Sequence, residues 1–372
     1  MAAIIILLII AACAAFQFLK GTLLKAFAMI IAVICAAVLA FGFFELLAQL
    51  IIGKNATPKF PALLPWAQPL SFILIFMLAF ALLQTAIELL AKQPVNFGDL
   101  PEKIGRSICG IFAGLLIAGL LITALDMAPL PNKFPYQRFT QNPKNAENPS
   151  GTLFNADRLV TGWFSLLSKG AFSGKNSFDA VHPDFIDQTF LNRLAADSEV
   201  SLASPTKIIS VPTKNGIYKA TENLRDTDGK PIQIKSGHEI IIVRVEMKKA
   251  DPKNGLTFTP AQLRLLYKPK ADAKKNLKGS AKNLYPIGFI KSENTIELKN
   301  LTDKIHIGKN NFISGKRDID FAFQLPNNTA PTLIQFKQNN IAKLSQIVSV
   351  DKALPAAPFE SSPLPEKKTK RK

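Results

Sequence analysis

The chain is poor in the side chains that most often carry catalysis or bind metals. Of its 372 residues, three are cysteine and three are histidine. All three cysteines lie in apolar stretches near the N-terminus: Cys13, Cys35 and Cys109. The C-terminal part therefore has neither a disulfide nor a cysteine nucleophile. Metal sites need larger clusters than the pairs His182/Asp184 and His238/Glu239, so we expect both pairs to be solvated.

Recognisable catalytic and cofactor motifs are also missing from the sequence. A trypsin-like protease needs a Gly-x-Ser-Gly-Gly stretch, and the nearest match, at residues 313–316, lacks the preceding glycine. His306 stands between two isoleucines and is expected to face outward on a strand. There is no Gly-x-x-x-x-Gly-Lys-Ser/Thr loop and no Gly-x-Gly-x-x-Gly fingerprint. We therefore expect no catalytic residue, no cofactor, no metal and no enzymatic activity.

Long apolar runs dominate the first 130 residues. A hydrocarbon layer about 30 Å thick is crossed by roughly 20 apolar helical residues. Four runs approach or reach that length: residues 2–18, 26–44, 69–90 and 107–125. A helix of a soluble protein is seldom apolar on every side over such a length. The pattern predicts an α-helical membrane bundle of four transmembrane helices over residues 1–130.

Lysines and arginines in the short loops indicate the orientation, because they gather on the cytoplasmic side. The loops after the first and third runs hold five of them: Lys20, Lys25, Lys92, Lys103 and Arg106. The loop after the second run holds two, Lys54 and Lys59. We therefore expect loops one and three to be cytoplasmic and the C-terminal part to lie outside the cytoplasm.

Ionisable residues within membrane helices are candidates for function. Glu45, Glu88 and Asp126 all lie near the ends of the predicted spans, where hydration or pairing with lysine accounts for them. Gln84 is the polar residue that stands furthest from a span end. No acidic or histidine relay crosses the middle of the membrane. A small membrane transporter or channel component is therefore the alternative function rather than the first.

Glycines in the last run favour close helix packing. Gly110 and Gly114 are four residues apart and share one helix face, and Gly119 follows. Small residues at this spacing let another helix backbone approach. The pattern does not distinguish packing within the subunit from self-association, and we expect the bundle to assemble through this face, alone or with a partner.

The order of these features resembles the CvpA (colicin V production protein) family of bacterial inner-membrane proteins. Such proteins open with a span and a basic-glycine pair, here Lys20-Gly21, which we place at the membrane interface. Their last span has a polar approach and a Gly-x-x-x-Gly core, here residues 103–106 followed by 110–114. The chain departs from the family where it has Ile4 and Ile5 instead of an early acidic residue, and Ala113 instead of a basic one.

The resemblance covers about residues 1–130. It implies a multi-pass protein of the bacterial inner (cytoplasmic) membrane, associated with toxin production or export, or with envelope homeostasis. It implies no established catalytic mechanism. Some relatives carry an external trypsin-like protease after this membrane domain, which agrees with a C-terminal domain in the periplasm or another extracytoplasmic space.

The rest of the chain divides into four segments. Residues 131–152 are rich in proline and predict a linker. Residues 153–200 predict juxtamembrane amphipathic helices, and the first carries Trp163, either at the membrane interface or packed on protein. Apolar and polar residues alternate over 205–350, which predicts a soluble mainly-β domain, a β-sandwich of immunoglobulin-like type. Residues 351–372 predict a disordered basic tail.

The net charge points to anionic partners. The chain carries a formal charge of +18, and its first 130 residues hold seven basic and five acidic side chains, so +16 belongs to the remainder. A basic domain beside a membrane favours anionic lipids, wall polymers or acidic proteins. We expect membrane lipids, a second copy or another envelope protein, and an anionic polymer or lipid as partners, and we expect nucleic acid not to be one. The first hypothesis is a non-enzymatic membrane protein whose β-domain binds a partner or ligand.

Overall fold

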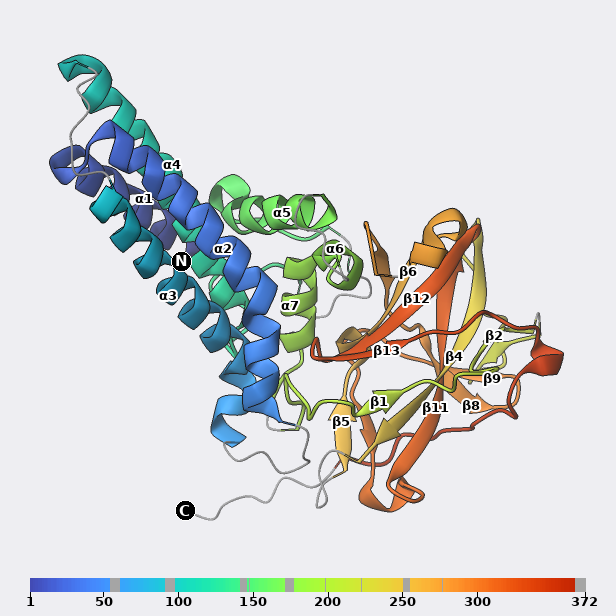
Figure 1. Ribbon diagram of the computed structural model, residues 1–372. Helices are drawn as coiled ribbons and strands as arrows, with labels where there is room; N and C mark the ends of the chain where they lie inside the picture. The colour runs from blue at the N-terminus through green and yellow to red at the C-terminus, as the bar shows by residue number, and fades with distance from the viewer. Residues whose placement is uncertain are drawn as a thin grey trace, which may run out of the picture.

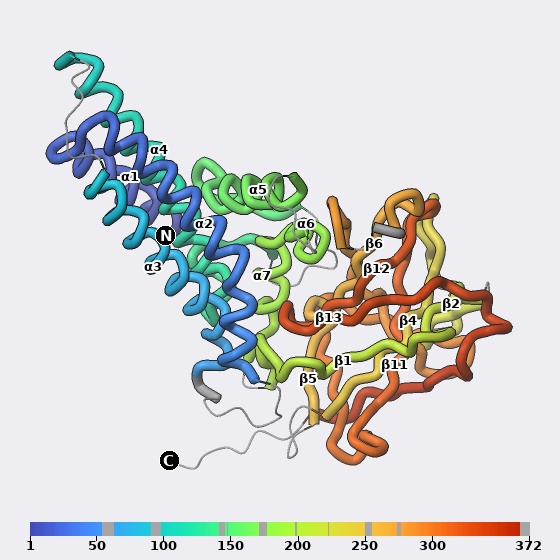
Figure 2. Tube along the Cα trace, viewed as in Figure 1, coloured from blue at the N-terminus to red at the C-terminus, as the bar shows by residue number. Residues whose placement is uncertain are grey.

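The computed structural model describes most of the chain. The described residues are 1–53, 61–90, 98–140, 146, 148–170, 177–197, 199–221, 223–249, 255–275 and 277–364. They form a bundle of long helices, a layer of short helices, and a domain of β-strands (Figure 1). Figure 2 shows the chain passing through these three layers in sequence order.

Within the described residues, four helices are long and apolar enough to cross a membrane. They are α1 (Ala2–Lys20), α2 (Leu23–Ile52), α3 (Ala67–Leu90, preceded by the short helix η1, Pro61–Trp66) and α4 (Asp99–Met127). Leucines, isoleucines and phenylalanines cover their outer surface, because hydrocarbon rather than water is the solvent there. The predicted four spans are confirmed.

The start of α4 holds the turn between α1 and α2. The Leu23 amide donates to the Glu102 carboxylate (2.6 Å), and the Arg106 guanidinium donates to the Gly21 carbonyl (2.9 Å). The same guanidinium lies over the Phe18 ring. These polar contacts sit at the basic end of the bundle, so Arg106 and the turn mark one boundary of the hydrocarbon layer.

A layer of short helices separates the bundle from the β-domain (Figure 1). It consists of η2 (Leu153–Asn155), α5 (Ala156–Lys169), α6 (Phe178–Val181) and α7 (Phe185–Arg193). Aromatic side chains join the layer to the bundle. The Phe41 ring of α2 stacks on Phe164 of α5 with centroids 4.8 Å apart, and it meets Phe178 and Phe185 edge-on. The juxtamembrane helices therefore share one core with the spans.

The β-domain is a sandwich of two main sheets. Among the described residues, one sheet has seven strands in the order β1-β4-β11-β8-β9-β3, with β2 also paired to β4, and the other has four in the order β13-β12-β6-β7. β5 and β10 form a separate pair. The strands are β1 (Ile209–Ser210), β2 (Ile217–Lys219), β3 (Arg225–Asp226), β4 (His238–Lys248), β5 (Leu256–Phe258), β6 (Leu263–Pro269), β7 (Lys282–Leu284), β8 (Gly288–Ser292), β9 (Thr295–Leu298), β10 (Ile305–Ile307), β11 (Lys316–Pro326), β12 (Thr329–Phe336) and β13 (Asn340–Lys343).

Side chains from both sheets interdigitate in one core. β4 and β11 pair along their whole length, with Val245 opposite Ile319 and Val243 opposite Phe321. Phe321 then meets Phe258, which packs edge-on against Phe336 of the second sheet, 5.4 Å between centroids. Apolar side chains on the facing sides of the two sheets thus build the predicted β-sandwich, as expected for stacked antiparallel sheets, and the middle of β4 and β11 is buried on both faces. The immunoglobulin-like type stays a prediction.

The first part of the predicted disordered tail is folded, so that expectation is wrong for residues 351–364. Phe359 is 1% exposed and packs edge-on against Phe289. Its amide donates to the Ile290 carbonyl, and the Ser362 amide donates to the His306 carbonyl. One phenylalanine among prolines and serines supplies enough apolar area to anchor the segment. The final basic run, residues 367–372, lies outside the described residues.

Candidate functional site

Close packing of α4 against its own chain occupies the glycine face. A Cβ atom on Gly110 would lie 2.9 Å from the Ala14 Cα of α1, and one on Gly114 would lie 2.8 Å from the Ile10 Cα. A Cβ on Gly119 would meet the Ala156 carbonyl of α5 at 2.2 Å. The face expected to assemble the bundle is therefore covered by α1 and α5 of the same subunit and is not free for a second copy.

The other residues singled out from the sequence lie apart from one another. Lys20 is the exposed last residue of α1, and Gly21 follows it as the C-cap. A Cβ on Gly21 would collide with the Gln17 carbonyl, so the turn needs glycine. Trp163 lies on α5, with its side chain 49% exposed. The basic-glycine turn and the tryptophan thus belong to different regions.

Two of the three carboxylates near span ends have environments other than pairing with lysine. Glu45 lies 2.5 Å from the His182 Nε2 atom, and His182 is only 2% exposed, so the expectation that this histidine is solvated is wrong. Asp126 is completely buried, and its carboxylate oxygens have no hydrogen-bond partner among the described residues. Glu88 is exposed on α3. Asp126 is thus buried and Glu45 contacts a histidine of the short helices, which sequence position alone does not reveal.

His306 is likewise buried rather than outward-facing. Its side chain is 5% exposed, and its Nδ1 atom lies 2.8 Å from the Thr257 hydroxyl across the β5–β10 pair. Burial lowers the pKa of His306, so the imidazole is neutral at physiological pH. The residue stabilises the small sheet and has no arrangement that suggests catalysis.

A cluster of buried charges gathers where α4 ends. The Arg138 side chain, 1% exposed, donates to Asp187 and to the Tyr136 hydroxyl, and that hydroxyl donates to Asp157. Burial, together with the nearby carboxylates, raises the pKa of Tyr136, which keeps its proton in place. Opposite it, Arg193 donates to the carbonyls of Leu125, Ala128 and Phe134 and so caps the end of α4. The cluster fixes the linker to the bundle.

A second set of polar side chains runs from α2 into the β-domain. His182 Nδ1 lies 3.0 Å from Gln188 Oε1, Gln188 donates to Gln335 Oε1 of β12 (3.0 Å), and Arg264 Nε of β6 donates to the same oxygen (2.8 Å). The Arg264 guanidinium also bonds to Tyr285. We call this set, Glu45–His182–Gln188–Gln335–Arg264–Tyr285, the polar chain.

The first two members of the polar chain join a spanning helix to the layer of short helices. The His182 Nε2 atom lies 2.5 Å from the Glu45 carboxylate of α2, and Nδ1 of the same ring lies 3.0 Å from Gln188 Oε1 of α7. The polar chain thus connects a carboxylate on a spanning helix to the β-domain.

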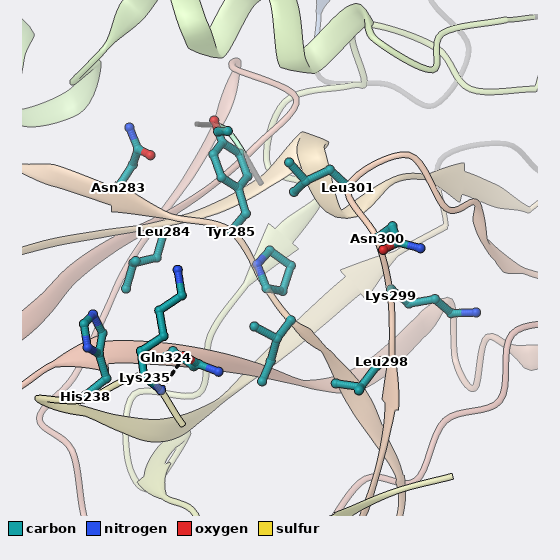
Figure 3. A pocket seen from close by; sticks show the side chains of 13 residues that line it. Lys235, His238, Asn283, Leu284, Tyr285, Leu298, Lys299, Asn300, Leu301 and Gln324 are labelled. Carbon is teal, nitrogen blue, oxygen red and sulfur yellow. Dashed lines mark hydrogen bonds between the residues drawn. The ribbon is translucent and has the colours of Figure 1, made fainter. Parts of the chain in front are cut away.

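Tyr285, the last member of the polar chain, lines a pocket of about 560 Å³ in the β-domain (Figure 3). Three amides contribute to the wall: Asn283, Asn300 and Gln324. Lys235 and His238 stand on one flank, where the Gln324 amide oxygen accepts from the Lys235 backbone, and Lys299 projects on the other. Leucines 284, 298 and 301 supply the apolar part.

The chemistry of this pocket favours an anionic ligand that also forms hydrogen bonds. Its lining includes two lysines, a histidine and no carboxylate, and the Glu297 carboxylate outside the lining pairs with one of the lysines, Lys299 (2.6 Å). Behind Tyr285, Arg264 is fully buried, and its hydrogen-bond acceptors are neutral: the Gln335 amide, the Tyr285 hydroxyl and the carbonyls of residues 181 and 183. Burial lowers the pKa of Arg264 to about 10, so the guanidinium keeps its charge at neutral pH. Asp184 and Glu45 offset part of this charge, and the remainder adds a positive potential to the pocket.

Comparison with known proteins identifies the N-terminal part. Residues 3–145 match the family model for colicin V production protein. The resemblance predicted from the basic-glycine turn and the glycine-rich last span is confirmed for this region. No curated protein matches the chain. Among solved structures, an uncharacterized β-sandwich protein from Clostridium difficile 630 resembles 37% of this chain and 84% of its own, with 11% identity and a TM-score of 0.21.

The colicin V production region thus comprises the four spans and the start of the linker, as far as Arg138 and its neighbours. The pocket, Gln188, Gln335 and Arg264 lie beyond it. Within the described residues, no group of three or more histidine, cysteine or acidic side chains could hold a metal ion. The sequence reasoning missed the pocket and the polar chain. The available signal was a polar side chain inside an otherwise apolar strand, as with Arg264 in β6 and Gln335 in β12.

Proposed function

We propose that the protein is a non-enzymatic membrane protein of the bacterial inner membrane, in which an external β-sandwich binds an anionic ligand or partner. The colicin V production region would anchor this domain and respond to its occupancy, in toxin production or export or in envelope homeostasis. The polar chain carries the proposal. It links the pocket residue Tyr285 to Glu45 of a spanning helix through contacts that are all buried or partly buried.

Buried polar links of this kind respond as a unit. Each member of the polar chain has its partner fixed by the next, so displacing Tyr285 in the pocket removes one of the four hydrogen-bond acceptors of the buried Arg264 guanidinium. Losing one acceptor of a buried charged donor costs about 1–3 kcal/mol, which favours a shift of Gln335 and Gln188 in response. A displacement of Tyr285 in the pocket can therefore be transmitted through the polar chain to α2 of the bundle.

The location of the β-domain is tested by reporter fusion. The reporter is joined after Leu364, because residues as far as Ser362 are bonded to the sandwich and an earlier junction would disturb it. We expect alkaline phosphatase to be active there and a cytoplasm-only fluorescent reporter to be dark. A junction after Lys103, expected to be cytoplasmic, is the control. Fluorescence after Leu364 would place the pocket in the cytoplasm and overturn the proposal.

Ligand binding is tested with the purified full chain in detergent micelles. Polygalacturonate, an acidic polysaccharide, serves as the anionic probe and neutral dextran as its control. Lys235→Glu reverses one charge in the pocket lining, and Lys343→Glu makes the same charge change on exposed β13, away from it. We expect loss of polygalacturonate binding in the first variant alone. Equal loss in both would mean that overall charge, and not the pocket, binds the polymer.

Asp126 favours a second candidate function, that of a transporter or channel component. A carboxyl group without hydrogen-bond donors, fully buried beside Asp157 and Arg193 at the end of α4, is a reasonable site for a transported proton. Proton flux into liposomes that contain the protein tests it. Flux that Asp126→Asn abolishes would support transport, whereas proteoliposomes as tight as protein-free liposomes would remove this candidate.

A further inference from the structure

Helix α5 is apolar on two sides. One side, with Val160 and Phe164, is buried against α2 and α4. The other carries Leu159, Trp163 and Leu166 at helical spacing, and the last two are 49% and 68% exposed. A helix at the surface of a water-soluble protein presents charged residues on its outer side. The outer side of α5 has the composition of a surface that contacts hydrocarbon.

The level of α5 along the spans agrees with that composition. Gly119, which contacts the α5 backbone, follows Arg106 by 13 residues, or about 20 Å of helix. Phe41, which stacks on Phe164, follows Leu23 by 18 residues, or about 27 Å. Arg106 and the Leu23 amide mark the first boundary of a hydrocarbon layer about 30 Å thick. α5 therefore lies roughly 3–10 Å inside the second boundary, and any tilt of the bundle moves it deeper.

A groove between α2, α4 and α5 opens beside this helix. Its wall includes Ala37 and Val38 of α2, Phe112 and Leu116 of α4, and Trp163 of α5, and all eleven lining residues are apolar. Phe112 is 38% exposed, and the neighbouring side chains Ile31 and Ile108 are 49% and 60% exposed. The groove is thus continuous with the lipid-facing surface of the spans. The enclosed part of the groove measures only about 30 Å³, so an acyl chain lies along its apolar wall rather than inside a cavity.

We propose that α5 lies in the leaflet next to the β-domain and that the groove it forms with α2 and α4 binds an acyl chain of a membrane phospholipid. In this arrangement α5 lies between the hydrocarbon and the short helices α6 and α7 (Figure 1). Arg158, near the start of α5, is 50% exposed and is placed to meet the headgroups, whereas Lys169 at the other end pairs with Asp179 (2.8 Å). This inference stands on the spans and α5 alone and does not depend on the ligand of the pocket.

The depth of α5 is measured by quenching of tryptophan fluorescence. The chain has two tryptophans, so Trp66→Phe leaves Trp163 as the reporter. The variant is placed in phosphatidylcholine nanodiscs whose acyl chains carry bromine at a shallow, middle or deep position. We expect loss of most of the emission with shallow bromine, less with deep bromine, and little quenching by aqueous iodide. Strong quenching by iodide without quenching by bromolipid would place α5 in water and overturn the proposal.

Occupancy of the groove is measured by native mass spectrometry of the full chain released from mild detergent. Val38→Trp fills the groove, and Leu39→Trp adds the same side chain to the adjacent exposed surface of α2. We expect wild type and Leu39→Trp to retain a bound phospholipid and Val38→Trp to lose it. Equal retention by the two variants, or no retained lipid in the wild type, would overturn the acyl-chain site.

Discussion

Replacing Gly114 with alanine should loosen the contact between α1 and α4. The new methyl group would lie 2.8 Å from Ile10 Cα and 3.1 Å from Cys13 Cβ. Carbon atoms in contact prefer 3.5–4.0 Å, so α1 must move away by about 1 Å. The atoms that would have to move include backbone, and no flexible side chain can yield in their place. Gly42 of α2 is the matched control, because nothing lies within 4 Å of its added methyl group.

The difference between the two variants isolates the cost of packing. Alanine favours the helical backbone over glycine by about 1 kcal/mol at both positions. Only Gly114→Ala adds overpacking, for which about 1–3 kcal/mol is typical. We therefore expect Gly42→Ala to match or exceed wild-type stability, and Gly114→Ala to fall below Gly42→Ala by about 1–3 kcal/mol.

The assay is unfolding in mixed micelles with rising mole fraction of sodium dodecyl sulfate, followed by helical circular dichroism. Oligomer size is measured in parallel, and we expect it to be unchanged, because α1 of the same chain covers this face. Indistinguishable midpoints for Gly114→Ala and Gly42→Ala would refute the packing argument. A change in oligomer size without a change in stability would mean that the Gly114 face of α4 contacts a second subunit.

Three further perturbations test particular buried groups. Burial lowers the pKa of Lys337 from 10.5 to about 7. Between these two pH values the unfolded chain binds more protons than the folded one. The free energy of unfolding should therefore rise with pH over this range, by up to about 5 kcal/mol. Lys337→Met should raise the unfolding midpoint at neutral pH and flatten its pH profile; an unchanged profile would contradict the assignment. Phe359→Ala should expose residues 353–364 to protease while the sandwich stays folded, and continued protection would contradict the anchoring role. Glu45→Gln should destabilise the protein by about 1–3 kcal/mol through its contact with His182, whereas Glu88→Gln on exposed α3 should not; equal unfolding midpoints would count against that contact.

Features fixed by neighbouring residues were predictable from the sequence. Hydrophobicity accumulates along each span, so the four helices needed no tertiary information. The strand β11 was also predictable, because its apolar residues Ile319, Phe321 and Phe323 occupy alternate positions and face one core. This alternation can be recognised in the sequence without knowing which strand is the partner.

Contacts between distant residues were not predictable in this way. Glu45 and His182 meet although 137 positions separate them, and neither residue differs locally from one that is solvated. The pocket likewise depends on how β4, β7, β9 and β11 are placed relative to one another. The folded segment around Phe359 was missed because its composition is that of a disordered chain. Long-range packing decided each of these cases.

The buried Arg138 changes what the proline-rich segment does in space. If residues 131–152 were a flexible linker, its two ends would be separated by an r.m.s. distance of about 25 Å, and the β-domain could move over that distance relative to the bilayer. Instead, Arg138 ties the segment to Asp187 of α7, Tyr136 ties it to Asp157 of α5, and the aromatic core holds the short helices to α2. The pocket consequently keeps a fixed distance from the bilayer and a fixed orientation relative to it. It can bind only ligands that come within that distance of the lipid surface.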